Sequence, residues 1–222
     1  GWEIIGTKEN IGSFKRADFV KYLRRGYVSE NVVVGIAGNF DSKKMKKEIE
    51  ARFGHIGHGK KPVSKKANDK QSAPGLFIQT KKTDQTHMIL GVDTYIDAGY
   101  LATQVGVEHK NLEETIRVIL DEYKKIATEK VDKEELAKAK EYIKGKIAMG
   151  FEGSDDVIEY LVTQEVSRGE VVLPKEKMKQ IDRVTADDIL RVAQDIFVNK
   201  KLNLTIIGPH TNSKKLEKLL TF

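Results

Sequence analysis

The sequence has no cysteine among its 222 residues. This excludes a disulfide scaffold, a thiolate zinc site and a cysteine nucleophile together. Any metal site would have to use His, Asp or Glu side chains. No apolar run approaches the roughly 18 residues that a membrane-spanning helix needs, so we expect no membrane association.

The short motifs of hydrolytic enzymes are also missing. There is no HExxH or HxxEH zinc motif and no GxSxG nucleophile elbow. The stretch Gly54–Lys61 fits the GxxxxGK core of a phosphate-binding loop, but Lys61 stands where the magnesium-binding Ser or Thr belongs. We therefore predict no catalytic residue and no metal ligand in this chain, and the substrate-binding residues stay unknown.

Histidines and acidic pairs are the remaining candidates for chemistry. His55 and His58 lie in a Gly-rich stretch with no carboxylate near, which predicts solvated side chains, while His109 and His210 are isolated in the sequence. His87 falls in a strand candidate, where it is expected at the core or rim. Negative charge at a helix start complements the helix dipole, so capping accounts for the four acidic pairs. These pairs are Glu113–Glu114, Glu134–Glu135, Asp155–Asp156 and Asp187–Asp188.

The formal charge is modest for a protein of this size. It is +6, from 39 Lys and Arg against 33 Asp and Glu, and it is dispersed along the chain. We therefore expect no nucleic-acid partner. The Lys60–Lys70 cluster leaves open a third hypothesis, in which the chain is a basic protein that holds peptides or nucleic acid.

An internal repeat relates the two ends of the chain. Residues 11–38 align with residues 181–208 without a gap, at a constant offset of 170. Each copy predicts an amphipathic helix, a turn and a short β-branched strand that ends at Gly, namely Asn31–Ala37 and Leu202–Ile207. In the later copy, Thr185 and Asp188 predict a capping box at the helix start.

The order of the remaining elements indicates an α+β fold. Three strand candidates, LFIQT, THMILGV and GYLATQVGV, follow one another and predict a largely antiparallel sheet. Amphipathic helices are expected after Asp41, Asn111 and Asp132 and, beyond a break at Gly150–Ser154, from Asp155 onward, and helices should cover one face of the sheet. Gly54–Pro74 has the composition of a linker. We predict part of a first domain at 1–53, a linker at 54–74 and a second domain at 75–222.

Taken together, these stretches resemble the pitrilysin/insulinase-type zinc peptidases, a family that includes the mitochondrial processing peptidases and bacterial processing proteases. The resemblance rests on IIGTKENIGSF, GYVSENVVVGIAGNFD, THMILG, DAGYLATQVGV, EELAKAKEYIKG and VTADDILRVAQDIF. It implies a clam-shell protein of two homologous α/β domains, of which the first is incomplete here. It also implies an HxxEH helix and zinc upstream of Gly1, and several dozen residues that are missing near 93–94.

The function that the resemblance implies belongs to a parent protein, since the chain should begin mid-protein. That protein would be a zinc metalloendopeptidase that encloses and cleaves unfolded peptides, acting as a homodimer or as a heterodimer with a related subunit. The alternative is a non-catalytic subunit of a two-protein zinc peptidase that contributes chamber wall and peptide binding. The chain alone should be inactive, and a bacterial cytoplasmic location is expected.

Overall fold

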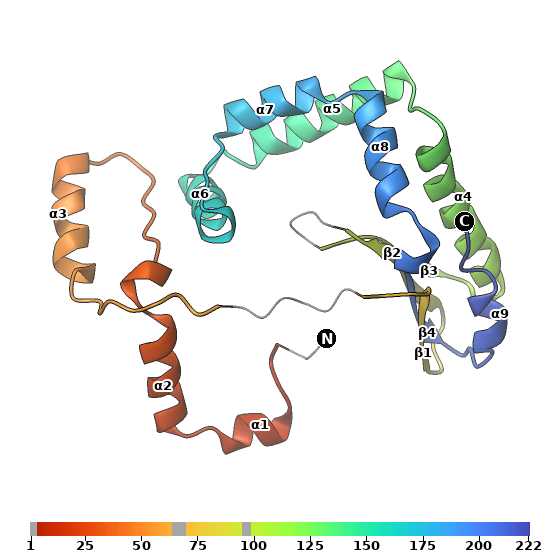
Figure 1. The fold of residues 1–222 in the computed structure, drawn as a ribbon, viewed down its shortest axis with the longest axis horizontal. Coiled ribbons are helices and arrows are strands. Elements are labelled where there is room, and N and C mark those ends of the chain that lie inside the picture. Colours follow the sequence, from red (N-terminus) through yellow and green to blue (C-terminus); the bar gives the residue numbers. More distant parts are fainter. Residues whose placement is uncertain (1–3, 64–69, 95–98) are drawn as a thin grey trace. The chain divides into compact units, whose positions relative to one another are not determined.

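The computed structural model describes residues 4–63, 70–94 and 99–222, which fall into two compact units (Figure 1). The first unit comprises Gly1–Ala67 and Gly145–Lys177, and the second comprises Asn68–Lys144 and Met178–Phe222. The boundaries expected from the sequence, 1–53, 54–74 and 75–222, stay a prediction.

The second unit is built on a mixed four-stranded sheet. Its strands are β1 (Gly75–Thr80), β2 (Thr86–Asp93), β3 (Tyr100–Val107) and β4 (Leu202–Gly208). Their order is β1-β4-β2-β3; β1 runs parallel to β4, whereas β4–β2 and β2–β3 are antiparallel. The α+β class and the largely antiparallel sheet are therefore as predicted.

One face of this sheet carries the core. Side chains alternate between the two faces of a strand, and Met88, Leu90 and Val92 of β2 are exposed by 1% or less. Leu204 and Ile206 of β4 extend the same buried face. The helices that cover it are α4 (Leu112–Thr128), α8 (Ala186–Ile196) and α9 (Ser213–Glu217) (Figure 1).

Helix α4 shows why this packing is specific. Leu112, Ile116, Leu120 and Tyr123 recur at helical spacing and are buried. The Tyr123 hydroxyl donates to the carbonyl oxygen of Leu90 at 3.2 Å, and its ring stacks on Phe197 with centroids 4.5 Å apart. Sheet, α4 and the end of α8 are thereby joined in one core.

The first unit is helical in its described part. It contains α1 (Lys8–Ser13), α2 (Arg16–Gly26), α3 (Ser42–Phe53) and α6 (Ser154–Arg168), while α5 (Lys133–Met149) and α7 (Pro174–Arg183) have residues in both units. Asp41 caps α3 as predicted, since its carboxylate accepts from the Lys44 amide at 2.9 Å.

The predicted strand at Asn31–Ala37 is wrong. Residues 32–37 have no regular secondary structure and pair with no described residue, and a strand exists only when its amides and carbonyls find partners. Gly35 lies against Ile158 and Val162 of α6, where an added Cβ would lie 2.6 Å from Ile158 Cδ1.

The elements around this segment nevertheless correspond to those around β4. Helices α2 and α8, and the 3-10 turns Ser29–Asn31 and Asn199–Lys201, coincide at the offset of 170 residues. Asp18 accepts from the Lys15 amide at 2.9 Å, and Asp188 accepts from the Thr185 amide at 3.0 Å, so both helices begin with the same contact.

Candidate functional site

The described residues contain no group of three or more His, Asp or Glu side chains that could hold a metal ion. His58 has one carboxylate near it: its Nδ1 lies 3.1 Å from the Ser29 hydroxyl and 3.5 Å from the Glu30 carboxylate. The expectation that no carboxylate lies near this histidine is therefore wrong, because Glu30 comes from a distant turn. Glu30 also accepts from the Gly59 amide at 2.8 Å, which lowers the pKa of its carboxyl. The His58 side chain is 92% exposed, as predicted for a solvated residue.

The four acidic pairs lie where the sequence predicts them, in the first turns of α4, α5, α6 and α8. The Asp132 carboxylate accepts from the Glu135 amide at 2.8 Å and so caps α5. At the start of α8, the Thr185 hydroxyl donates to Asp188 at 2.7 Å and holds the pKa of that carboxyl below its usual value. These carboxylates lie at helix N-termini, where their negative charge stabilises the helices.

A buried polar cluster joins three distant parts of the second unit. The Thr86 hydroxyl, on a residue with no exposed surface, lies 2.8 Å from His109 Nδ1 and 2.6 Å from His210 Nε2. His109 Nε2 lies 2.9 Å from the Thr83 carbonyl, which only accepts, so this nitrogen carries the proton. Thr86 then donates to His109 and accepts from His210. The expectation that these two histidines are isolated is wrong, because the fold brings them together at Thr86.

The second face of the sheet lies opposite the helices and is open. In register across β1, β4, β2 and β3 it carries Phe77, Thr205, Ile89 and Gln104. Phe77 is 62% exposed and Ile89 is 44% exposed. His87 also lies on this face and is exposed, so a core position for this histidine, one of the two expected, is wrong. We call this surface the open sheet face.

Among the described strands, β3 pairs with β2 alone and β1 pairs with β4 alone, so both are edge strands. An unpaired edge presents a row of amides and carbonyls that can pair with another extended chain. The open sheet face and the β3 edge are therefore surfaces of this unit that suit an extended peptide, and the β1 edge is a further one.

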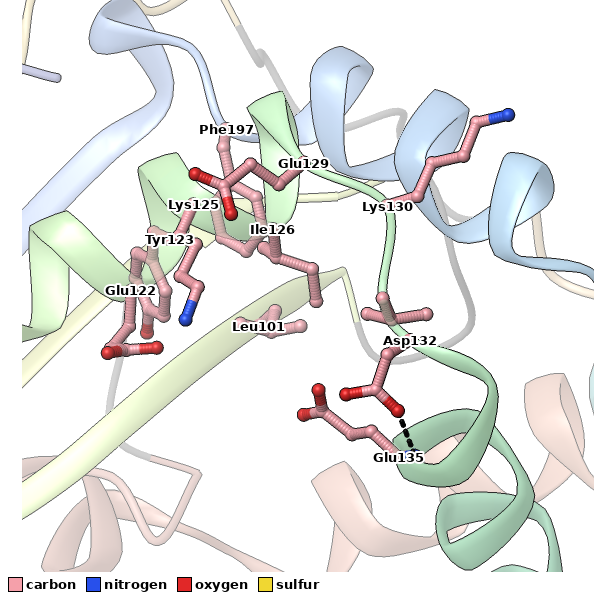
Figure 2. A pocket seen from close by; sticks show the side chains of 11 residues that line it. Leu101, Glu122, Tyr123, Lys125, Ile126, Glu129, Lys130, Asp132, Glu135 and Phe197 are labelled. Atoms are coloured by element: carbon pink, nitrogen blue, oxygen red, sulfur yellow. Dashed lines mark hydrogen bonds between the residues drawn. The ribbon is translucent and has the colours of Figure 1, made fainter.

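Two adjoining hollows lie on the other side of β3. Figure 2 shows the larger one, of about 570 Å³, between β3, the end of α4 and the start of α5. The smaller one, of about 360 Å³, runs between β3, α4 and α8. Both are lined by Leu101, Ile126 and Phe197. We call the two hollows together the β3–α8 groove.

No helix in the described part of the chain is long and apolar enough to cross a membrane.

Comparison with known proteins agrees with this architecture. A protease of Helicobacter pylori superposes with a TM-score of 0.78 at 16% identity, covering 92% of this chain and 61% of that one. A peptidase M16 inactive domain of Pseudomonas fluorescens gives the same TM-score at 13% identity, over 93% of this chain and 60% of that one. The fold is that of an M16 peptidase domain.

The sequence itself matches the family described as "Peptidase M16 inactive domain" over residues 13–95 and 89–143. The chain therefore belongs to this family, within the pitrilysin/insulinase-type zinc peptidases.

Relatives found by sequence comparison are also named as zinc proteases or processing peptidases. An uncharacterized zinc protease of Mycobacterium leprae is 22% identical over 269 aligned positions, covering 99% of this chain and 60% of the relative. The mitochondrial-processing peptidase subunit beta of Blastocladiella emersonii is 23% identical over 265 positions, covering 94% and 56%. This chain thus spans about three fifths of the length of the relatives it matches. The described residues offer no group of three or more side chains that could hold zinc. We therefore assign no catalytic step to them.

Proposed function

We propose that this chain is the non-catalytic, peptide-binding part of a zinc-dependent metalloendopeptidase that encloses unfolded peptides. Membership of the M16 inactive-domain family carries the proposal. The relatives named zinc proteases support zinc in the whole protein, held by residues other than those described here. A bacterial cytoplasmic location belongs to the same proposal.

The open sheet face and the β3 edge are the surfaces that would receive the peptide. Main-chain pairing along an edge strand gives affinity with little demand on sequence, which suits a substrate defined by being unfolded. Exposed Phe77 and Ile89 add apolar contact for its side chains. The matched helices and caps at the offset of 170 residues support an internal duplication, so a second such sheet in the parent protein is part of this proposal.

A second candidate is a non-catalytic subunit of a two-protein peptidase. A relative named as a subunit of a processing peptidase favours it. In that case a related partner chain supplies the zinc and this chain supplies chamber wall. An HxxEH segment encoded upstream of Gly1 in the parent gene separates the two candidates, because only the first requires it.

Peptide binding is tested with a fluorescein-labelled, unstructured 20-residue peptide titrated with the 222-residue chain. Ile89→Asp places a charge on the open sheet face and should weaken binding at least tenfold. Val118→Asp, at a 54% exposed position on α4, is the matched control and should bind as the unmodified chain does. Equal binding by both variants would refute the assignment of this surface.

A further inference from the structure

We propose that the β3–α8 groove docks an amphipathic segment of another polypeptide chain. Bulky apolar side chains of that segment enter the groove, and its Lys or Arg side chains meet the acidic rim. This surface is separate from the open sheet face, and the proposal does not depend on peptide cleavage.

Exposure of the groove's apolar floor is the first observation. Leu101 pairs with Val92 on the face of the sheet that carries the core, yet Leu101 is 41% exposed, whereas Val92 is 1% exposed. Val184, beside α8, is 38% exposed and lines the smaller hollow with Ile189 and Val192. A core-facing strand position that stays this open lacks an apolar cover, and contiguous exposed apolar surface marks sites of interaction.

The charge at the rim is the second observation. Although the whole chain carries +6, the larger hollow is lined by Glu122, Glu129, Asp132 and Glu135 against two lysines. Lys130 points away from the other labelled side chains in Figure 2, and its ammonium group lies 2.6 Å from the Asp187 carboxylate. Its positive charge therefore does not offset the acidic side chains that line the hollow. Glu122, Glu129 and Glu135 form no ion pair with any described residue. The unpaired negative charge around an apolar floor selects a segment that is both basic and apolar.

The relatives give the third observation. The alignments with the two relatives extend over 269 and 265 positions, whereas this chain has 222 residues, so the relatives contain residues with no counterpart here. The family match divides into two stretches that overlap at residues 89–95, in the second half of β2 and just beyond its end. Both facts favour a position of the extra residues near the end of β2, where Val92 pairs with Leu101. We infer that a segment of the same chain covers this groove in the relatives, and that a separate chain does so here.

Fluorescence anisotropy tests the docking directly. The probe is a labelled 18-residue peptide of Leu and Lys with all leucines on one helical face, titrated with the 222-residue chain. A Leu/Glu peptide of the same pattern tests the charge requirement, and a Leu/Lys peptide of scrambled order tests the apolar face. We expect binding of the first peptide at least tenfold tighter than of either other, weakening as salt is raised.

Matched variants place the site. Leu101→Asn should weaken binding at least tenfold, whereas Tyr100→Asn, on the opposite face of β3 and 66% exposed, should not. Glu129→Gln with Glu135→Gln should weaken binding about fivefold and reduce its salt dependence, whereas Glu114→Gln with Glu134→Gln, outside the groove, should leave both unchanged. Circular dichroism confirms that each variant is folded.

Three results would overturn the proposal. These are no binding of the Leu/Lys peptide, equal losses in Leu101→Asn and Tyr100→Asn, and self-association of the chain that the peptide competes away. The last would assign the groove to a second copy of this chain.

Discussion

The imidazole rings of His109 and His210 meet edge to face, with their centroids 5.9 Å apart. The Thr86 hydroxyl lies between them and bonds one nitrogen of each. These contacts hold together the start of β2, the turn before α4 and the segment after β4. Acid should therefore weaken the second unit.

Stability of the second unit should fall as the pH falls below about 7. Burial, with the nearby charge of His109, lowers the pKa of His210 below that of a free histidine, about 6.5. Between the lowered pKa and 6.5 the unfolded chain binds more protons than the folded chain, so the free energy of unfolding rises with pH across this window. Urea unfolding at pH 5.0 and 7.5 measures the difference.

His210→Asn should flatten this pH dependence, because the titrating group is removed. His87→Asn is the control, since His87 is exposed on the open sheet face and should leave the pH profile unchanged. Identical profiles for the two variants would show that the Thr86 cluster does not couple folding to pH.

Thr86→Val should destabilise the chain by about 1–3 kcal/mol. The valine keeps the shape of the threonine, but it leaves the His210 Nε2 proton and the His109 Nδ1 lone pair without their buried partner. Thr205→Val replaces an exposed threonine on the neighbouring strand and should change the free energy of unfolding by no more than about 0.5 kcal/mol. Equal effects in chemical denaturation would contradict the hydrogen-bond assignment.

Adjacent residues of β2 should respond very differently to truncation. Leu90 has no exposed surface, and Leu90→Ala should cost about 2–5 kcal/mol through the cavity it leaves. Ile89 is 44% exposed on the opposite face, and Ile89→Ala should cost about 0.5 kcal/mol. Hydrogen exchange of the β2 amides reports both values. A large loss for Ile89→Ala would mean that the open sheet face is covered in solution.

Gly35→Ala should destabilise the first unit by about 1–3 kcal/mol, because the new methyl group overpacks the contact with Ile158 and Val162. Gly145→Ala, in α5 with no atom within 4 Å of an added Cβ, should instead stabilise by about 0.5–1 kcal/mol. Limited proteolysis of the two variants compares them, and faster cleavage of Gly145→Ala would contradict this account.

Local patterns predict much of the fold. Short apolar or β-branched runs predict β1, β2 and β4, alternation predicts β3, and the caps at Asp41, Asp132 and Thr185 predict three helix starts. These signals work because each depends on residues close in sequence. The Asn111 cap is the exception: its side chain makes no capping bond, although Asn111 does precede α4.

Features that depend on residues far apart in the sequence cannot be predicted from local patterns. The apolar run Asn31–Ala37 resembles β4 in composition, but a strand also needs neighbours, which no local pattern supplies. The approach of His109 to His210 depends on how β2 and β4 pair. The β3–α8 groove combines residues of β3, α4, α5 and α8, so only the fold reveals that Leu101 stays open.

The most direct test of the central claim uses the native protein, isolated from its source with an antibody against this chain. Its intact mass, zinc content and cleavage of an unfolded, labelled casein are measured on one sample. The account predicts a protein or complex well above 25.0 kDa that contains zinc and cleaves casein. A species of 25.0 kDa with no zinc and no cleavage would contradict it.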